Sequence, residues 1–327
     1  MKLFSSVIVF YLGIMVLCCF SKCKKPETNA AKSPFQKEVV DGSLNINLDG
    51  QVILSYAIET RFPDDTLPKY FKRSGFIHPL KTKSGVILTD DFPRGHTHQH
   101  GLFTAWRSAT FRGKNIDFWN QAAELGIVKH SKILDARDDS SISVEMESIA
   151  LTEKDSVLVL DERWDMEVLD RGDYYIIDWQ ITQDANGKDS LILDKYTYGG
   201  VGFRGNDEWN TPNSFDSLCY FKTNDGLDQT DANHTRPLWA SMYGKVGGKM
   251  GGIGIIQGKK NLRYPQFIRV HPSMPYYCFL PTVEEAYTIG PDDQLISDYR
   301  LVVFDGEVDP EVMKKEMDDF NNFSTSD

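Results

Sequence analysis

Apolar and polar residues alternate in short runs through most of this chain, and a two-residue period predicts β-strands. The first two runs, 44–48 and 52–58, flank Asp49-Gly50, a dipeptide typical of tight hairpin turns. Residues 206–252 are rich in Gly, Asn, Asp and Thr, which predicts long loops. The other runs that predict strands are 85–89, 133–136, 142–149, 157–168, 174–182, 191–198, 253–257, 267–270, 276–280 and 299–304.

Helical periodicity is confined to the C-terminus. Asp309 is a suitable capping residue, Pro310 favours the first helical position, and apolar residues then recur at helical spacing as far as Phe320. Because the predicted strands follow one another at short intervals, the pattern favours antiparallel sheets and disfavours a βαβ fold. We therefore predict a mainly β protein, with a single large antiparallel β-sandwich domain over 35–327 and a short C-terminal helix.

The N-terminus has the pattern of an export signal. An apolar run over 3–20 follows a short basic start, and no second apolar segment is long enough to cross a membrane. We predict a lipoprotein-type signal peptide over 1–23 with Cys23 as the lipidated residue, and a polar linker over 24–34. An uncleaved membrane anchor, or lipidation of an earlier cysteine, is the alternative. The expected location is the periplasm or the outer membrane, with a lipid anchor as the only membrane contact.

Charge and cysteine content limit the partners and the compartment. The formal net charge is −11 and no basic block follows the N-terminus, so nucleic acid is not an expected partner. Cys219 and Cys278 both fall within the predicted domain. An oxidising compartment permits a disulfide between them without requiring one, and the sequence leaves both possibilities open.

Histidines are concentrated in one place. Three of the seven occupy alternate positions, at His96, His98 and His100. If this piece is extended, the three imidazoles point to one face. Such a cluster binds a metal, transfers protons or holds a polar ligand. His271 follows the predicted strand 267–270 and is a candidate fourth member.

A carboxylate stands on an otherwise apolar strand face. Along 157–168, Glu162 shares one face with Leu160 and Trp164, whereas Asp161 points the other way. An unpaired buried carboxylate is costly, so Glu162 requires a partner or a raised pKa. Either outcome suits a general base; a structural ion pair or a bulge in the strand is the alternative.

A glycine-rich stretch follows the predicted strand 191–198. Its glycines allow close backbone approach, and Arg204 offers a planar guanidinium for an oxyanion or a carboxylate, with Tyr198 nearby in sequence. The spacing matches no phosphate-loop motif. Trp106, shortly after the histidines, is a candidate stacking surface for a sugar, although buried tryptophans more often belong to the core.

A metal site is the alternative to acid–base chemistry at the histidines. Alternate positions on one strand supply two ligands well, and a third comes more often from another segment. The chain has no HExxH motif. We therefore expect no cofactor, and leave open a divalent metal held by His96, His98 and His100.

The segment 93–106 and the element Asn115-Ile-Asp117-Phe118-Trp119 resemble DUF6807, a family of uncharacterised bacterial proteins often labelled methane-oxygenase (PmoA)-like. The chain departs from that pattern at Gln99 and His100, where many members have His and Arg. The label implies little, because a particulate methane oxygenase is an integral membrane protein. By fold analogy the resemblance implies a galactose-mutarotase-like supersandwich, in which a His and a Glu act as an acid/base pair on sugars. Further matching segments are Ser84-Gly85-Val86, Glu162-Arg163, Tyr198-Gly-Gly-Val-Gly-Phe-Arg204 and His234-Thr-x-Pro-Leu-Trp239.

Together these patterns predict an exported enzyme that acts on a carbohydrate or modified sugar by epimerisation, hydrolysis or elimination. Glu162 is the candidate general base and His98 or His96 the candidate acid. A non-catalytic glycan-binding protein and a histidine-cluster metalloenzyme are the alternatives. The residues expected to contact the substrate are His100, Trp106, Tyr198, Arg204 and His271.

Overall fold

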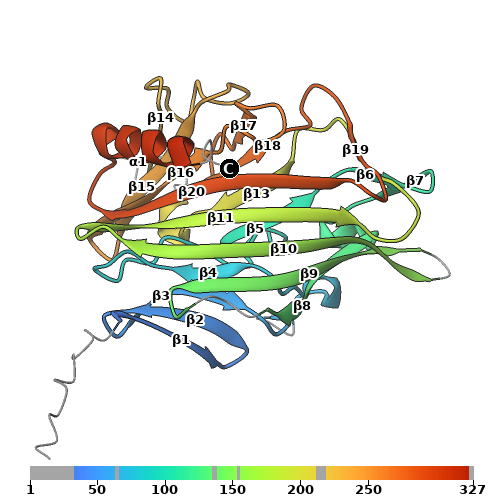
Figure 1. Ribbon diagram of the computed structural model, residues 1–327, viewed down its shortest axis with the longest axis horizontal. Helices are drawn as coiled ribbons and strands as arrows, with labels where there is room; N and C mark the ends of the chain where they lie inside the picture. Colours follow the sequence, from blue (N-terminus) through green and yellow to red (C-terminus); the bar gives the residue numbers. More distant parts are fainter. Residues whose placement is uncertain (1–32, 63–65, 135–137, 153–154, 211–218, 324–327) are drawn as a thin grey trace, which may run out of the picture. The chain divides into compact units, whose positions relative to one another are not determined.

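Two antiparallel β-sheets make up most of the structure, a computed structural model that describes residues 33–62, 66–134, 138–152, 155–210 and 219–323. Within these residues each sheet has eight strands, and the second sheet, with its long central strands, faces the viewer in Figure 1. The first sheet has the order β1 (Phe35–Val40), β2 (Ser43–Leu48), β3 (Gln51–Ala57), β4 (Ile77–Leu80), β5 (Leu102–Trp106), β13 (Gly199–Arg204), β18 (Tyr276–Leu280), β17 (Phe267–Val270). The second has the order β14 (Cys219–Thr223), β15 (Trp239–Val246), β16 (Lys249–Gln257), β20 (Gln294–Asp305), β11 (Tyr174–Ala185), β10 (Ser156–Asp170), β9 (Ser141–Leu151), β8 (Gly126–Ile133).

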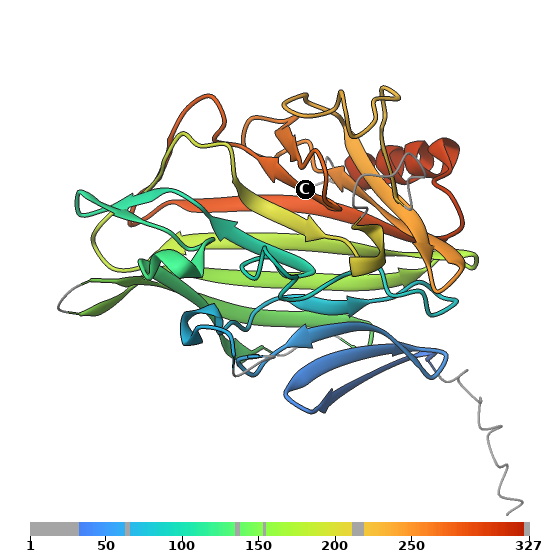
Figure 2. The ribbon, with the colours of Figure 1, turned by 180° about the vertical axis from the view of Figure 1, so that it is seen from behind.

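Shorter elements lie around the two sheets. The first sheet is nearer the viewer in Figure 2. A four-stranded sheet within the described residues has the order β19 (Tyr287–Ile289), β12 (Leu191–Leu193), β6 (Ala109–Phe111), β7 (Lys114–Ile116). Single turns of 3-10 helix are η1 (Lys69–Phe71), η2 (Gln121–Ala123) and η3 (Asp207–Trp209), and the C-terminal helix is α1 (Pro310–Phe323). The predicted class, a large antiparallel β-sandwich with a short C-terminal helix, is confirmed.

Apolar side chains from both large sheets fill the space between them. Trp164 and Trp179 of the second sheet are fully buried, with ring centroids 4.6 Å apart in a T-shaped arrangement. Tyr277 and Phe279 of the first sheet belong to the same buried cluster. Burial of such large rings supplies much of the hydrophobic driving force for folding. Both tryptophans are therefore core residues.

The predicted hairpin is present, because Asp49 and Gly50 both adopt positive φ in the turn between β2 and β3. Several other boundaries differ from the prediction. The run 85–89 forms only isolated bridges, and 191–198 is a strand only over β12. The run 133–136 starts at the last residue of β8, and its residues 135 and 136 lie outside the described residues. The stretch 206–252, predicted as loops, contains β14 and β15.

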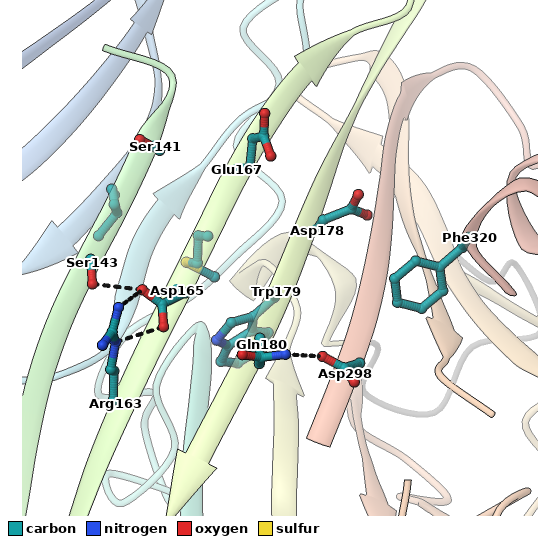
Figure 3. A pocket seen from close by; sticks show the side chains of 12 residues that line it. Ser141, Ser143, Arg163, Asp165, Glu167, Asp178, Trp179, Gln180, Asp298 and Phe320 are labelled. Atoms are coloured by element: carbon teal, nitrogen blue, oxygen red, sulfur yellow. Dashed lines mark hydrogen bonds and ion pairs between the residues drawn. The ribbon is translucent and has the colours of Figure 1, made fainter. Parts of the chain in front are cut away.

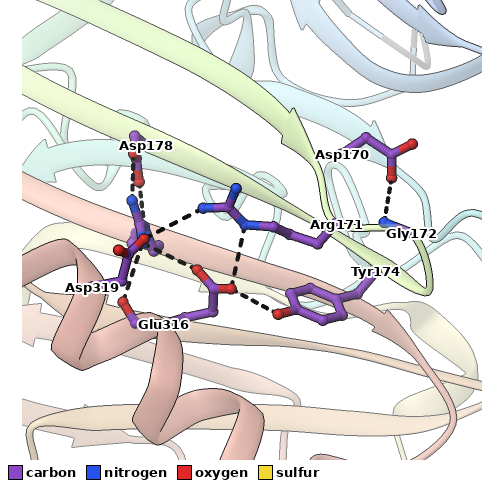
Figure 4. Close-up of polar contacts among 8 residues, drawn as sticks. Asp170, Arg171, Gly172, Tyr174, Asp178, Glu316 and Asp319 are labelled. Atoms are coloured by element: carbon purple, nitrogen blue, oxygen red, sulfur yellow. Dashed lines mark hydrogen bonds and ion pairs between the residues drawn. The ribbon is translucent and has the colours of Figure 1, made fainter.

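Helix α1 is fixed to the second sheet by a buried arginine. Arg300 of β20 binds Asp178 of β11 (Nε–Oδ1 2.6 Å) and, through Nη1, Glu316 and Asp319 of the helix at 3.1 Å and 3.0 Å. Tyr174 also donates to Glu316 (2.7 Å), as Figure 4 shows. Arg300 and Glu316 are only 3% and 1% exposed, so this ion pair is largely removed from water. The prediction that Asp309 caps the helix is confirmed by its bond from the Glu311 amide (2.9 Å).

The predicted signal peptide and Cys23 lie outside the described residues, as does nearly all of the polar linker. No helix in the part of the chain that the structure describes is long and apolar enough to cross a membrane. Cys219 and Cys278 are both buried and both carry free thiols, so the two cysteines of the domain do not pair.

Candidate functional site

The segment that carries the histidine cluster is a succession of tight turns. The His96 amide donates to the Pro93 carbonyl (3.0 Å), and the Gln99 amide donates to the His96 carbonyl (2.8 Å). An extended piece with three imidazoles on one face is therefore not formed. The rings of His96 and His98 remain neighbours, with centroids 5.8 Å apart and both side chains partly exposed.

His100 leaves the cluster and enters the core. Its side chain is fully buried, stacks on Phe76 at 4.8 Å and meets Phe92 edge-on at 4.6 Å. Its Nδ1 lies 2.9 Å from Asp91 Oδ1, and its Nε2 lies 3.3 Å from the Gln121 amide nitrogen. The predicted contact of His100 with substrate does not agree with this burial, and we regard His100 as a structural residue that holds the segment against the sheet.

His271 takes the place expected for His100. It follows β17 and its ring centroid lies 5.8 Å from that of His96. Its main-chain amide donates to the Tyr276 carbonyl (2.9 Å), which extends the pairing of β17 with β18 by one residue. We call the three residues His96, His98 and His271 the histidine site. The sequence named all three, but could not show which of the other histidines would join the first two.

Strand register shows on which face of the first sheet the site lies. Two rows of paired residues cross β13, β18 and β17. In the first row Arg204 pairs with Tyr276, which is also the partner of His271. In the second row Gly202 pairs with Cys278, and Cys278 pairs with Arg269. Because alternate residues of a strand point to opposite faces, these side chains share one face. The intervening row faces the second sheet, since Val201, Phe279 and Ile268 belong to the buried cluster between the sheets. The histidine site is therefore on the outer face of the first sheet.

Arg204 supports the site from below its surface. It is 1% exposed, and its guanidinium contacts Gln99 Oε1 (3.4 Å), Asn210 Oδ1 (2.8 Å) and Asp90 Oδ2 (3.7 Å). It is close enough to lower the pKa values of His96 and His271. Arg204 thus lies near the histidines. Two of its five N–H groups donate to Gln99 and Asn210, and its buried Nε has no hydrogen-bond partner among the described residues.

A second arginine was missed by the sequence reasoning. Arg269 of β17 lies on the same face as His271, two residues earlier, and its Nη2 donates to the Tyr198 hydroxyl (3.0 Å). Its guanidinium carbon lies 5.1 Å from the centroid of the Tyr198 ring. The available signal was the two-residue spacing of Arg269 and His271 at the end of a predicted strand. Tyr198, which the sequence did name, therefore does lie beside the site.

Glu162 lies on the other side of the first sheet. Its carboxylate accepts hydrogen bonds from Thr104, Trp164 and Gln183 in the space between the two large sheets. Thr104 faces inward from β5, next to Phe103 of the outer face. Burial raises the pKa of Glu162, against the three donors and the Arg73 charge. The sequence correctly indicated a buried, partnered carboxylate, but its expected convergence with the histidines does not occur.

Aromatic residues form the floor of the outer face without being exposed. Trp106 is 5% exposed and belongs to the core cluster of the small sheet, so its predicted role as a stacking surface does not agree with its position. Trp119 packs against Tyr198 and Tyr276, with centroids 6.0 Å and 5.7 Å away. The hydroxyl of the fully buried Tyr276 has no hydrogen-bond partner among the described atoms.

All three imidazoles of the histidine site are held neutral. Burial lowers the pKa of His98 to about 4, assisted by His96 and Arg107. Burial lowers the pKa of His271 to about 4 as well, assisted first by Arg269. The pKa of His96 is lowered by burial and by Arg204. The groups that act on these rings are thus cationic or are other imidazoles, which favours the uncharged form.

The hydrogen bond at His271 fixes its tautomer. Its Nδ1 accepts from the Ser273 amide (3.3 Å), which leaves the proton of the neutral ring on Nε2. His271 therefore presents a donor at Nε2. His96 and His98 make no side-chain hydrogen bond with any residue that the structure describes, so each is available to a ligand as donor or acceptor.

The geometry does not assemble the metal site that the sequence left open. Because His100 is buried against Phe76 and Phe92, the set His96, His98 and His100 does not converge on one point. Among the described residues no group of three or more His, Cys, Asp or Glu side chains is arranged to hold a metal ion.

A hollow of about 450 Å³ lies on the outer face of the second sheet. Its polar side chains largely bind one another. Asp165 accepts from Ser143 (2.6 Å) and pairs with Arg163 (2.7 Å), and Gln180 donates to Asp298 (2.9 Å), as Figure 3 shows. The sequence gave no indication of this hollow.

Comparison with known proteins places the chain in a family. The family described as "Family of unknown function (DUF6807)" matches residues 43–318, which include every residue of the histidine site. The chain belongs to this family. The predicted resemblance is thereby confirmed. No curated protein matches the chain.

Some solved structures are similar at low identity. A galactose mutarotase-like protein from Clostridium acetobutylicum is 12% identical, with 83% of this chain and 98% of that protein covered and a TM-score of 0.35. A polysaccharide lyase is 9% identical, with 87% and 34% covered and a TM-score of 0.34. A GH36 α-galactosidase from Geobacillus stearothermophilus, bound to raffinose, is 8% identical, with 83% and 40% covered and a TM-score of 0.34. The chain thus spans about a third of the lyase and two fifths of the galactosidase.

Proposed function

We propose that this protein binds a sugar or modified sugar at the histidine site and catalyses a proton transfer on it. The observation that carries the proposal is the meeting of His96, His98 and His271, from two distant segments, with neutral and partly exposed rings on one sheet face. Imidazoles and a guanidinium suit the hydroxyl groups of a sugar, and the neighbouring Tyr198 ring suits its C–H face.

Different imidazoles have different roles in this proposal. His271 donates from Nε2, because its Nδ1 is engaged by the Ser273 amide. His98, free of side-chain partners among the described residues, accepts the proton, and His96 lies between the two. Arg204 is a positioning residue that acts through Gln99 (3.4 Å). Glu162, the base expected from the sequence, has no part in this mechanism.

The reaction classes left by the sequence are not equally compatible with this arrangement. Glycoside hydrolysis most often uses two carboxyl groups on either side of the glycosidic bond. The charged groups that act on the three imidazoles are instead Arg107, Arg204 and Arg269. Proton transfer at carbon, as in epimerisation or elimination, is therefore the favoured class.

Substitution of the two outer imidazoles tests this function. A panel of neutral and acidic sugars is incubated with the protein and followed by NMR for epimer or elimination products. We expect His98→Asn and His271→Asn to lower turnover by about a hundredfold or more, the usual contribution of general acid–base groups. His234→Asn is the matched control, because His234 has positive φ, which Asn tolerates. Unchanged turnover in both site variants would sink the proposal.

Non-catalytic glycan binding is the second candidate, and one observation favours it. A pKa of about 4 makes His98 and His271 weak bases in the free protein. Binding of a sugar with no conversion by the wild-type protein, and loss of that binding in His271→Asn, would support this candidate over the enzyme.

We also propose that the protein is exported and held at a membrane by a lipid on Cys23. This proposal is supported by the apolar run 3–20 and the cysteine that follows it. Mass spectrometry of the mature N-terminus tests it, since an unmodified Cys23 in the membrane fraction would contradict it.

A further inference from the structure

Arg269 has hydrogen-bond donors that the protein does not use. Its Nη1 donates to Asn233 Oδ1 (2.9 Å) and to the Val270 carbonyl (2.6 Å), and its Nη2 donates to Tyr198 (3.0 Å). A guanidinium has five N–H groups, so Nε–H and one Nη2 hydrogen are left among the described contacts. Nε and Nη2 form one edge of the group, and arginine binds carboxylates in bidentate fashion through such an edge.

The charge of Arg269 is also left without a counterion. Its partners are an amide oxygen, a carbonyl and a hydroxyl, and no carboxylate of the described residues forms a salt bridge with it. Nearby arginines differ in this respect. Arg204 Nη2 lies 3.7 Å from Asp90 Oδ2, and Arg107 Nη1 lies 2.9 Å from Asp117 Oδ2. In a chain with a net charge of −11, an unpaired guanidinium fixed beside three imidazoles is a local site for an anion.

We propose that the ligand of the histidine site carries a carboxylate and that Arg269 binds it: the substrate is a sugar acid, such as a uronate. This inference rests on the proposed sugar function and specifies its substrate class. Arg269 and His271 lie on one face, two residues apart, so the N–H groups of Arg269 that the protein does not use and the Nε2–H donor of His271 can converge on the same carboxylate. Arg269 is kept in place by Asn233, Tyr198 and its own strand.

A carboxylate at this position also accounts for a proton-transfer reaction. When the C–H bond next to the carboxylate breaks, the proton goes to His98 and the electron pair moves onto the carboxylate oxygens. Arg269 and His271 stabilise the charge that develops there. Delivery of a proton from a water molecule to the opposite face of the same carbon gives the epimer, and the hydroxide that is left takes the proton from His98. Expulsion of a leaving group from the adjacent carbon by the same electron pair gives the elimination product, and the leaving oxygen takes the proton that His98 holds.

A bound carboxylate also changes the pKa of His271. Arg269 is one of the groups that lower the pKa of His271, and Arg204 acts on His96 in the same way. A carboxylate that neutralises Arg269 removes part of this effect, so the pKa of His271 rises on binding. A neutral sugar leaves the pKa of His271 where it is, or lowers it through further desolvation.

Matched pairs of sugars test the proposal directly. D-glucuronate differs from D-glucose, and D-galacturonate from D-galactose, by a carboxylate in place of a hydroxymethyl group. We expect calorimetry to show that at least one acid binds about tenfold or more tightly than its neutral partner, as a charge-assisted hydrogen bond implies. Arg269→Gln is expected to abolish this difference. Arg112→Gln, at an exposed ion pair with Asp189, is the control and is expected to retain it.

The outcomes separate this inference from the proposed function. If neutral sugars bind as tightly as their acids, the carboxylate proposal is wrong and the sugar function stands. If no sugar of either kind binds, both are wrong. A readout on the wild-type protein remains valid even where Arg269→Gln fails to fold: the pKa of His271, followed by NMR, rises with the acid and does not rise with the neutral sugar. An equal response to both sugars would overturn the proposal.

Discussion

Thr104 donates a hydrogen bond to Glu162 from the face of β5 that points away from the histidine site. This bond holds the Glu162 carboxylate in the interior of the sandwich, where Trp164 and Gln183 also donate to it. All three partners are donors, so an ionised carboxylate, which only accepts, satisfies them. Arg73, fully enclosed in the same region, supplies compensating charge.

Glu162→Gln is therefore expected to affect stability and not the site. The amide of the Gln side chain places an NH₂ group opposite at least one of the donors Thr104, Trp164 and Gln183, so a hydrogen bond is lost. It also removes the negative charge that interacts with Arg73. We expect the free energy of unfolding, measured by urea denaturation, to fall by about 1–3 kcal/mol. Glu167→Gln, at an exposed position of the same strand, is the control and is expected to be nearly silent. A large loss of turnover with unchanged stability would instead return Glu162 to the catalytic set.

Acid is expected to destabilise the protein through His98. Its pKa is lowered from 6.5 to about 4, so the unfolded chain binds more protons than the folded protein between these values. By linkage, the stability contributed by neutral His98 is present above pH 6.5 and is lost as the pH falls towards 4. Asp91, whose pKa burial raises to about 8, acts in the opposite direction.

Because His98 and Asp91 act in opposite directions, the effect of His98 is isolated by comparing a His98 variant with the wild-type protein. Between pH 6.5 and 4 we expect His98→Gln to lose less free energy of unfolding than the wild type. NMR titration of the His98 ring provides a direct value for comparison. A ring that titrates near its ordinary pKa, together with equal acid losses in both proteins, would contradict the account.

Gly200 is expected to be intolerant of a side chain. It has φ +72°, and a Cβ there would lie 2.3 Å from the Phe279 carbonyl oxygen. Gly187 has φ +86° with open space around it, so Gly187→Ala isolates backbone strain, about 1 kcal/mol. We expect Gly200→Ala to lower the free energy of unfolding by about 3 kcal/mol or more, because the backbone of β18 must move. Equal effects of the two substitutions in denaturant titrations would show that the strands do not approach this closely.

Helix α1 is expected to depend on Arg300. Arg300→Gln leaves Glu316, only 1% exposed, without its main cation, so we expect a loss of about 3–5 kcal/mol in the free energy of unfolding. Lys314→Gln removes an exposed helical pair with Asp318, and its effect on thermal melting is expected to be small. Similar melting temperatures for the two variants would mean that the buried network does not hold the helix.

Local sequence patterns were enough to predict the fold class. Alternation found β9, β10, β11 and β18 within a few residues, and Asp309-Pro310 found the start of the helix. Alternation also identified Glu162 as buried, since it shares a face with Trp164. It failed over 93–100, because Pro93 and Gly95 lie in turns where the two-residue period does not hold. His100 was assigned to the wrong environment for that reason.

Long-range pairing limited the prediction of the site. Whether His271 or Glu162 meets His96 depends on which strands pair and on which face of the sheet each side chain lies. One sequence contains the alternation of each strand but not the register between β13, β18 and β17. Arg269 was recognisable only once that register placed it beside Tyr198 and on the face of His271.

The central claim is that His96, His98 and His271 form one ligand site, and NMR of the histidine side chains during titration with D-glucuronate tests it most directly. The account predicts that the three rings shift together with a single dissociation constant, while buried His100 and distant His130 do not follow it. Shifts of His100 or His130 with no change at the three site histidines would contradict it.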